Sequence, residues 1–105
     1  MLFRRQCISL ARGCKRQYEL FLADSMYRVV EMKMVQRTLS TSEVISLAYD
    51  DQLLQYLESV LHIRLRYHGD FHADVSLTRY LIGKVYYYRN DPRRALHHLD
   101  LALSQ

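Results

Sequence analysis

Residues that make tight turns are scarce in this chain of 105 residues, which has three glycines and one proline. A β-sandwich or barrel needs many tight turns, so this scarcity argues against both and favours long helices. No apolar run approaches the roughly 18 to 20 residues needed to span a bilayer. Two cysteines are too few for a disulfide scaffold, and Cys7 and Cys14 lack the spacing of metal ligands. The chain is 50% hydrophobic, which is enough for one small domain with a buried core.

Acidic residues are missing from residues 1–17, the basic head. Its five positive charges are Arg4, Arg5, Arg12, Lys15 and Arg16. The formal net charge of the whole chain is +4, so the rest of the chain sums to about −1. A nucleic-acid-binding domain carries a basic face across its folded body, and this body is nearly neutral. The charge distribution therefore argues against nucleic acid as the partner.

The basic head is also amphipathic when it is read as a helix. Its apolar stripe is Phe3, Cys7, Leu10, Ala11 and Cys14, and Arg5, Arg12 and Arg16 lie opposite. One interpretation is a helix that packs this stripe on the domain of a cytoplasmic protein. The alternative is a cleaved mitochondrial targeting segment, since residues 16–18 loosely resemble a processing site.

Helical spacing and capping residues predict five helices, over residues 15–37, 41–49, 51–67, 74–89 and 92 to the end. Ser40 and Glu43 form a capping box, and Asp50 and Asp91 are further N-caps. Gly69 ends the third helix. The apolar stripe of the first long helix is Leu22, Met26, Val29, Val30 and Met34. Residues 18–49 are expected to form a cap or a degenerate repeat, and residues 50–105 a helical repeat region.

Two of the predicted helices carry the same apolar spacing, 42 residues apart. The first stripe is Leu53, Leu54, Leu57, Val60 and Leu61, and the second is Ala95, Leu96, Leu99, Ala102 and Leu103. A period of 20 to 50 residues is typical of helical repeat arrays. We expect either that the chain self-associates through the second stripe, or that it forms part of a longer array of repeats.

From about residue 53 to residue 105 the chain resembles a tetratricopeptide repeat protein, in the form found in kinesin light chains. The segment from Ile63-Arg64 to Gly69, His72, Asp74 and Val75 resembles the loop that precedes a repeat in that family. The helix pair that follows resembles the repeat signature at Ile82-Gly83, Tyr86, Ala95, Leu99 and Ala102. The resemblance implies an all-α fold of antiparallel helix pairs, a short solenoid with a long N-terminal helix.

The resemblance also assigns roles to individual residues. Gly83 and Ala95 are small because the paired helices cross closely, and Tyr86 and Leu99 fill the gap between layers. Ala102 leaves room for the next helix. The first helices of such pairs line a groove, which places Leu77, Tyr80, Lys84, Tyr87 and Tyr88 at a partner-binding surface. The tyrosines suit recognition because they bury a large area and keep a polar tip.

The sequence shows no catalytic constellation. No glycine-rich phosphate loop or framed nucleophile is present, and adjacent His97 and His98 point about 100° apart on a helix. Both histidines are expected to be solvated, and His72 is expected to cap a helix. We therefore expect a scaffold or adaptor without enzymatic activity, metal or cofactor, which binds a peptide or a partner helix. The alternative is a small mitochondrial structural or assembly factor.

Overall fold

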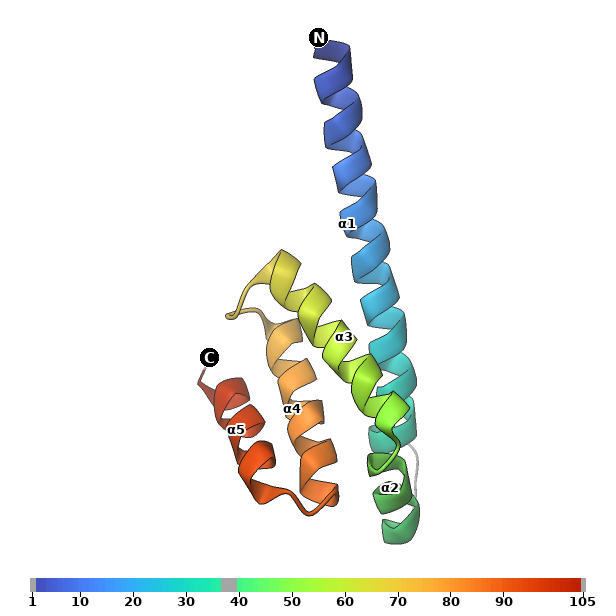
Figure 1. The fold of residues 1–105 in the computed structure, drawn as a ribbon, viewed down its shortest axis with the longest axis vertical. Coiled ribbons are helices and arrows are strands. Elements are labelled where there is room, and N and C mark those ends of the chain that lie inside the picture. Colours follow the sequence, from blue (N-terminus) through green and yellow to red (C-terminus); the bar gives the residue numbers. More distant parts are fainter. Residues whose placement is uncertain (1, 37–39, 105) are drawn as a thin grey trace.

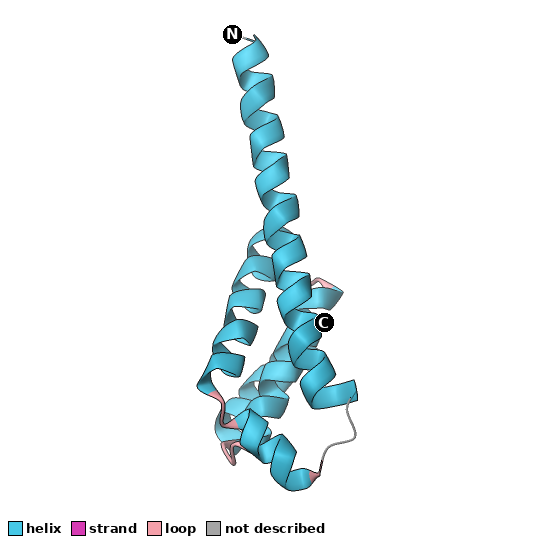
Figure 2. Cartoon of the chain, turned by 90° about the vertical axis from the view of Figure 1, so that its right-hand side faces the viewer, coloured by secondary structure: helices cyan, strands magenta, loops and turns pink. Residues whose placement is uncertain are grey.

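The computed structural model describes residues 2–36 and 40–104. The elements run in the order α1 (Leu2–Glu31), the π-helical segment η1 (Met32–Gln36), α2 (Thr41–Ala48), α3 (Asp51–His68), α4 (Ala73–Tyr88) and α5 (Pro92–Leu103). Within these described ranges the chain forms helices and no strand, which confirms the all-α class (Figure 2). None of the described helices is long and apolar enough to cross a bilayer.

The helix ends lie where the capping residues predict them. Ser40 Oγ accepts a hydrogen bond from the Glu43 N–H at 3.3 Å and donates one to Glu43 Oε1 at 3.0 Å, which completes the capping box. The side chains of Asp50 and Asp91 cap α3 and α5. Gly69 ends α3 with a φ of 79°, a left-handed conformation that glycine adopts without a steric penalty.

The helices pack mainly against their neighbours in the chain. α1 lies antiparallel to α3, and α4 lies between α3 and α5 and runs antiparallel to both (Figure 1). The N-terminal part of α1 extends well beyond the other helices, which gives a molecule of 59 × 26 × 20 Å (Figures 1 and 2). Burial of α4 between α3 and α5 explains part of its nearly continuous apolar sequence, while Leu77, Tyr80 and Tyr87 stay exposed.

The core lies where α1, α3 and α4 meet, with small contributions from η1, α2 and α5. Its buried hydrophobic residues are Ala23, Tyr27, Val30, Met34, Ala48, Leu53, Leu57, Val60, Leu81, Ile82, Val85, Tyr86 and Ala95. The predicted stripe of α3 therefore faces the core, with Leu54 and Leu61 packed at its margin.

The first helix differs from its prediction in two ways. The structure has one uninterrupted helix from Leu2 to Glu31. Of the predicted stripe, Val30 and Met34 are buried and Met26 packs against the core, whereas Leu22 and Val29 are 40% and 47% exposed. Ala23 and Tyr27 complete the buried face. The side of α1 that is buried depends on where α3 lies, and spacing within α1 does not fix that position. Thr38 and Leu39, in the predicted break after this helix, lie outside the described residues.

The basic head forms the start of α1. Cys14 is exposed, and so are Arg12, Lys15 and Arg16. The predicted packing of the apolar stripe on the domain is therefore wrong at Cys14. The N-terminal part of α1 extends beyond α3 (Figure 1). The other four residues of that stripe, within residues 3–11, lie outside the described side chains.

Polar contacts fix the ends of the bundle. At one end, Arg89 at the end of α4 donates to the Ala48 carbonyl oxygen and to Asp51 Oδ1, and Tyr49 donates to the Arg89 carbonyl oxygen at 2.9 Å. At the other end, Glu19 of α1 accepts a 2.6 Å hydrogen bond from the hydroxyl of Tyr67 in α3. These contacts hold α2 against α4, and α1 against α3, beyond the limits of the apolar core.

Candidate functional site

Gly83 allows α4 and α5 to cross in contact. A Cβ atom at Gly83 would lie 2.8 Å from Leu99 Cγ and 3.2 Å from the Ala95 carbonyl oxygen, both closer than ordinary van der Waals contact. Ala95 is buried at this crossing. The structure therefore brings together three of the five residues that the sequence assigned to packing between the paired helices.

The other two packing residues differ from each other in burial. Tyr86 is buried and its ring stacks on the ring of His98, with 5.6 Å between centroids. Ala102 is half-buried near the end of α5. The expectation of two solvated histidines is wrong for His98, which packs against Tyr86 and leaves its Nδ1 atom without a partner among the described residues. Burial, followed by the neighbouring charge of His97, lowers the pKa of His98.

The five residues predicted to bind a partner form one side of α4, which we call the α4 face. At 100° per residue Leu77, Tyr80, Lys84, Tyr87 and Tyr88 fall within an arc of about 100°. Leu77, Tyr80 and Tyr87 are 49%, 51% and 66% exposed. Lys84 is half-buried, and Tyr88 packs against the core and meets the Tyr87 ring edge-on. The α4 face therefore presents three exposed apolar side chains around one lysine.

A hollow of about 250 Å³ lies at one end of the α4 face, between α1, α3 and α4. Its lining is largely charged: Asp24, Tyr27, Arg28, Glu31, Arg64, Asp74 and Leu77. Leu77 joins this hollow to the α4 face. The surface between α1 and α4 is therefore polar at one end and aromatic further along α4, a combination that the sequence did not predict.

Arg64 is the buried centre of this hollow. Its side chain is only 5% exposed, and Nη2 donates to Asp24 Oδ1 at 2.9 Å. Nη1 donates to Thr78 Oγ1 at 2.9 Å and to the Asp74 carbonyl oxygen at 3.2 Å, and the guanidinium lies 4.5 Å from the centroid of Tyr27. A buried charge requires such partners. Arg64 thus connects α1, α3 and α4 through one side chain.

Sequence reasoning placed Arg64 only in the loop resemblance and gave it no structural role. The missed signal is its spacing, because Arg64 continues the buried series Leu57 and Val60 by four residues, on the same face of α3. A charged residue at such a position indicates a buried polar network. Asp24 and Tyr27, its partners on α1, could not be found in this way because no local pattern connects them to α3.

Tyr27 borders the same hollow with its polar end. Its ring is buried in the core, and burial followed by the charge of Glu31 raises the pKa of its hydroxyl to about 12. The nearby Arg64 guanidinium acts in the opposite direction and is the weaker influence. Tyr27 therefore stays protonated over the physiological pH range and supplies a neutral hydroxyl to this surface.

A second hollow, of about 500 Å³, lies on the α5 side of Leu77 and is lined by Phe71, Ala73, Ser76, Leu77 and Ala102. Phe71 is 86% exposed beside it. The outer stripe of α5 is also open, since Leu96 and Leu103 are 60% and 83% exposed. Apolar side chains thus lie open on both α4 and α5.

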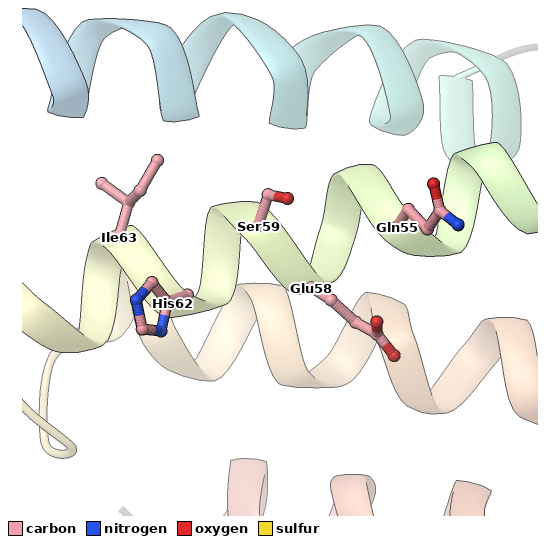
Figure 3. A pocket seen from close by; sticks show the side chains of 5 residues that line it. All are labelled: Gln55, Glu58, Ser59, His62 and Ile63. Carbon is pink, nitrogen blue, oxygen red and sulfur yellow. The ribbon is translucent and has the colours of Figure 1, made fainter.

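The outer surface of α3 contains a shallow hollow of about 550 Å³. Figure 3 shows its lining residues, Gln55, Glu58, Ser59, His62 and Ile63, all of which come from α3. Ser59 and Ile63 lie toward α1, and Glu58 and His62 lie on the other side of the helix. Their side chains do not converge on one point, so this surface lacks the arrangement needed for a catalytic or metal site.

Three side chains with metal-binding atoms lie together at the corner between α3 and α4. His68, His72 and Asp74 each offer a ligand atom, and these atoms lie within 4.8 Å of one another. The Nδ1 atom of His72 accepts a 3.0 Å hydrogen bond from the Asp74 N–H, which confirms that His72 caps α4. The sequence therefore predicted the cap but not the cluster around it.

Comparison with known proteins found no matching family model, no similar curated protein and no similar solved structure. The resemblance to the tetratricopeptide repeat therefore remains one of motif and spacing over residues 53–105. Independently of this resemblance, the part of the chain that the structure describes is helical and contains no strand.

Proposed function

We propose that the chain is a protein-interaction module of the tetratricopeptide repeat type, a scaffold or adaptor without catalytic activity. One observation carries this proposal: Leu77, Tyr80 and Tyr87 are large apolar side chains exposed on one side of a helix whose opposite side is buried. Large apolar groups exposed together are typical of a surface that a partner covers. The contact between Gly83 and Leu99 supports the pairing of α4 and α5 as one repeat.

The expected ligand is a peptide or a helix of another protein. Tyr80 and Tyr87 would supply most of the buried apolar area, and tyrosines of this kind are common binding hot spots. Lys84 is the only charged residue among the five, so one acidic group of the ligand is expected to pair with it. The charged hollow beside Leu77 would then accept a polar part of the same ligand.

The test is an affinity capture with the full chain, followed by measurement of the dissociation constant for the captured protein. Tyr80→Ala should weaken binding by about 2 kcal/mol or more, the size expected of a central anchor. Lys84→Ala should weaken it by about 0.5 to 2 kcal/mol, the size of one partly desolvated charged contact. Raising salt from about 0.1 to 0.5 M should have a modest effect, because only one contact is screened.

Tyr56→Ala is the matched control, because Tyr56 is an exposed tyrosine on α3, at 40% exposure, outside the α4 face. It should leave the dissociation constant unchanged. Binding that collapses in high salt and survives Tyr80→Ala would refute the proposal. In that case the basic head would be the binding element.

The alternative function, a mitochondrial structural or assembly factor, is supported by the position of the basic head. Arg12, Lys15 and Arg16 are exposed on α1, and the N-terminal part of this helix extends beyond the bundle (Figure 1). A receptor or protease could reach such a segment without unfolding the core. Mass spectrometry of the mature protein separates the two functions: a start near Tyr18 supports mitochondrial import, and an intact Met1 supports a cytoplasmic module.

A further inference from the structure

The corner that joins α3 to α4 brings two imidazoles and one carboxylate to one place. His68 is the last residue of α3, His72 is the N-cap of α4, and Asp74 lies in the first turn of α4. The positive φ of Gly69 reverses the chain between them. Two helix ends that the fold already holds together thus supply all three side chains.

The distances within this cluster are close to those of a coordination shell. Asp74 Oδ2 lies 4.0 Å from His68 Nε2 and 3.9 Å from His72 Nδ1. Ligands of a tetrahedral zinc ion, with bonds of about 2.0 to 2.1 Å, are about 3.4 Å apart. The His68 and His72 rings are stacked, with 3.9 Å between centroids. The planes of the two rings are 14° apart, so side-chain rotation has to tilt the rings toward each other before their nitrogen atoms can face one ion.

The three side chains of the cluster are open to water. The three side chains are 20%, 41% and 39% exposed, in the order His68, His72 and Asp74, so water can complete the coordination shell. The nearby positive charge of Arg64 is paired with Asp24.

We propose that His68, His72 and Asp74 form a binding site for a divalent transition-metal ion, of which Zn²⁺ is the best match. Imidazole ligands suit zinc, and three protein ligands leave one position open to water. Coordination through His72 Nδ1 replaces its capping hydrogen bond to the Asp74 N–H. The ion would thereby link the end of α3 to the start of α4. Asp74 also lines the charged hollow beside Leu77, so the metal site shares this residue with the surface proposed for partner binding.

The experiment uses the full chain in a Cys7→Ser, Cys14→Ser background, so that thiols do not bind the metal. Calorimetric titration with Zn²⁺ alone should show one equivalent bound with micromolar affinity, and visible absorption should report Co²⁺ in the same site. Saturating Zn²⁺ should also raise the melting temperature, since an ion that binds only the folded state stabilises it.

Two variants remove ligands while preserving the fold. His72→Asn keeps an N-capping side chain and Asp74→Asn keeps the side-chain shape, so both should retain the circular dichroism of the parent. Each should weaken Zn²⁺ binding at least tenfold and abolish the thermal shift. His97→Asn, which removes an exposed histidine on α5, is the matched control and should bind as the parent does.

Saturable binding that depends on His72 and Asp74 but not on His97 would support the site. The proposal is overturned if the parent shows no saturable binding up to about 100-fold above the protein concentration. It is equally overturned if His72→Asn and Asp74→Asn both bind Zn²⁺ as tightly as the parent, or if His97→Asn weakens binding as much as they do. Should one ligand variant fail to fold, the other decides the question.

Discussion

Replacing Gly83 by alanine tests whether α4 and α5 cross in contact. The added Cβ would lie 2.8 Å from Leu99 Cγ, 3.0 Å from Leu99 Cδ2 and 3.2 Å from the Ala95 carbonyl oxygen. Leu99 Cγ is a branch point, and the carbonyl oxygen belongs to the backbone of α5. Leu99 Cγ moves only if the whole side chain changes its χ1 rotamer, and the carbonyl oxygen moves only with the backbone, so the two helices must separate by a few tenths of an ångström.

Two opposing effects set the size of the change in stability. Overpacking a well-filled contact costs about 1 to 3 kcal/mol. Alanine is the better helix former by about 1 kcal/mol, which offsets part of that cost. The expected net loss is about 1 kcal/mol, which corresponds to a fall in melting temperature of about 4 to 8 °C for a domain of this size.

Urea unfolding followed by circular dichroism measures this loss, with Gly13→Ala as the matched control. A Cβ at Gly13 meets no other atom within 4 Å, so that substitution gains helix propensity with no clash. It should leave the midpoint unchanged or raise it. In a Leu99→Ala background, Gly83→Ala should become neutral or stabilising, because the closest contact is gone. A Gly83→Ala variant that is more stable than the parent would show that the helices do not meet at this point.

Three further outcomes are expected. Asp24→Ala should destabilise the fold more than Arg64→Met. The first variant leaves a buried guanidinium without its carboxylate, whereas the second leaves a carboxylate that is 51% exposed and stays hydrated. The free energies of unfolding of the two variants, measured in urea, should differ by about 1 kcal/mol or more. The pKa of His98 lies below its ordinary value of 6.5. The stability that His98 contributes is therefore complete above pH 6.5 and is lost as the pH falls toward its folded-state pKa. His98→Gln should flatten this part of a plot of unfolding free energy against pH. The pKa of Tyr27 is raised from 10.0 to about 12. The stability that Tyr27 contributes is therefore complete below pH 10 and is lost as the pH rises toward 12. In an ultraviolet titration, Tyr27→Phe should remove the tyrosine that ionises last.

Capping chemistry made the helix ends predictable. The Ser40–Glu43 box, the Asp50 cap and the turn at Gly69 each depend on groups a few residues apart, so local sequence contains all the information they need. The cap formed by His72 has the same local origin. These residues fixed the order and bounds of α2 to α5 to within one or two residues.

The buried face of the first helix was predictable only in part, since Val30 and Met34 are buried as expected. Leu22 was expected in the core and is 40% exposed, whereas its neighbour Ala23 is fully buried, because the position of α3 decides which side of α1 is covered. The exposure of Cys14 was not predicted either. The N-terminal part of α1 extends beyond α3 (Figure 1).

The sequence by itself determined the elements of this protein, because helix propensity, capping and the shortage of turn residues act over a few neighbouring residues. It also determined the arc of Leu77, Tyr80 and Lys84, since spacing along one helix fixes which residues share a face. Only the tertiary structure decided which partners meet across helices. Arg64 and Asp24 are 40 residues apart in the sequence, and their hydrogen bond depends on how α1 and α3 pack. Such contacts are set by the whole fold, in which burial of the shared core overrides local preference.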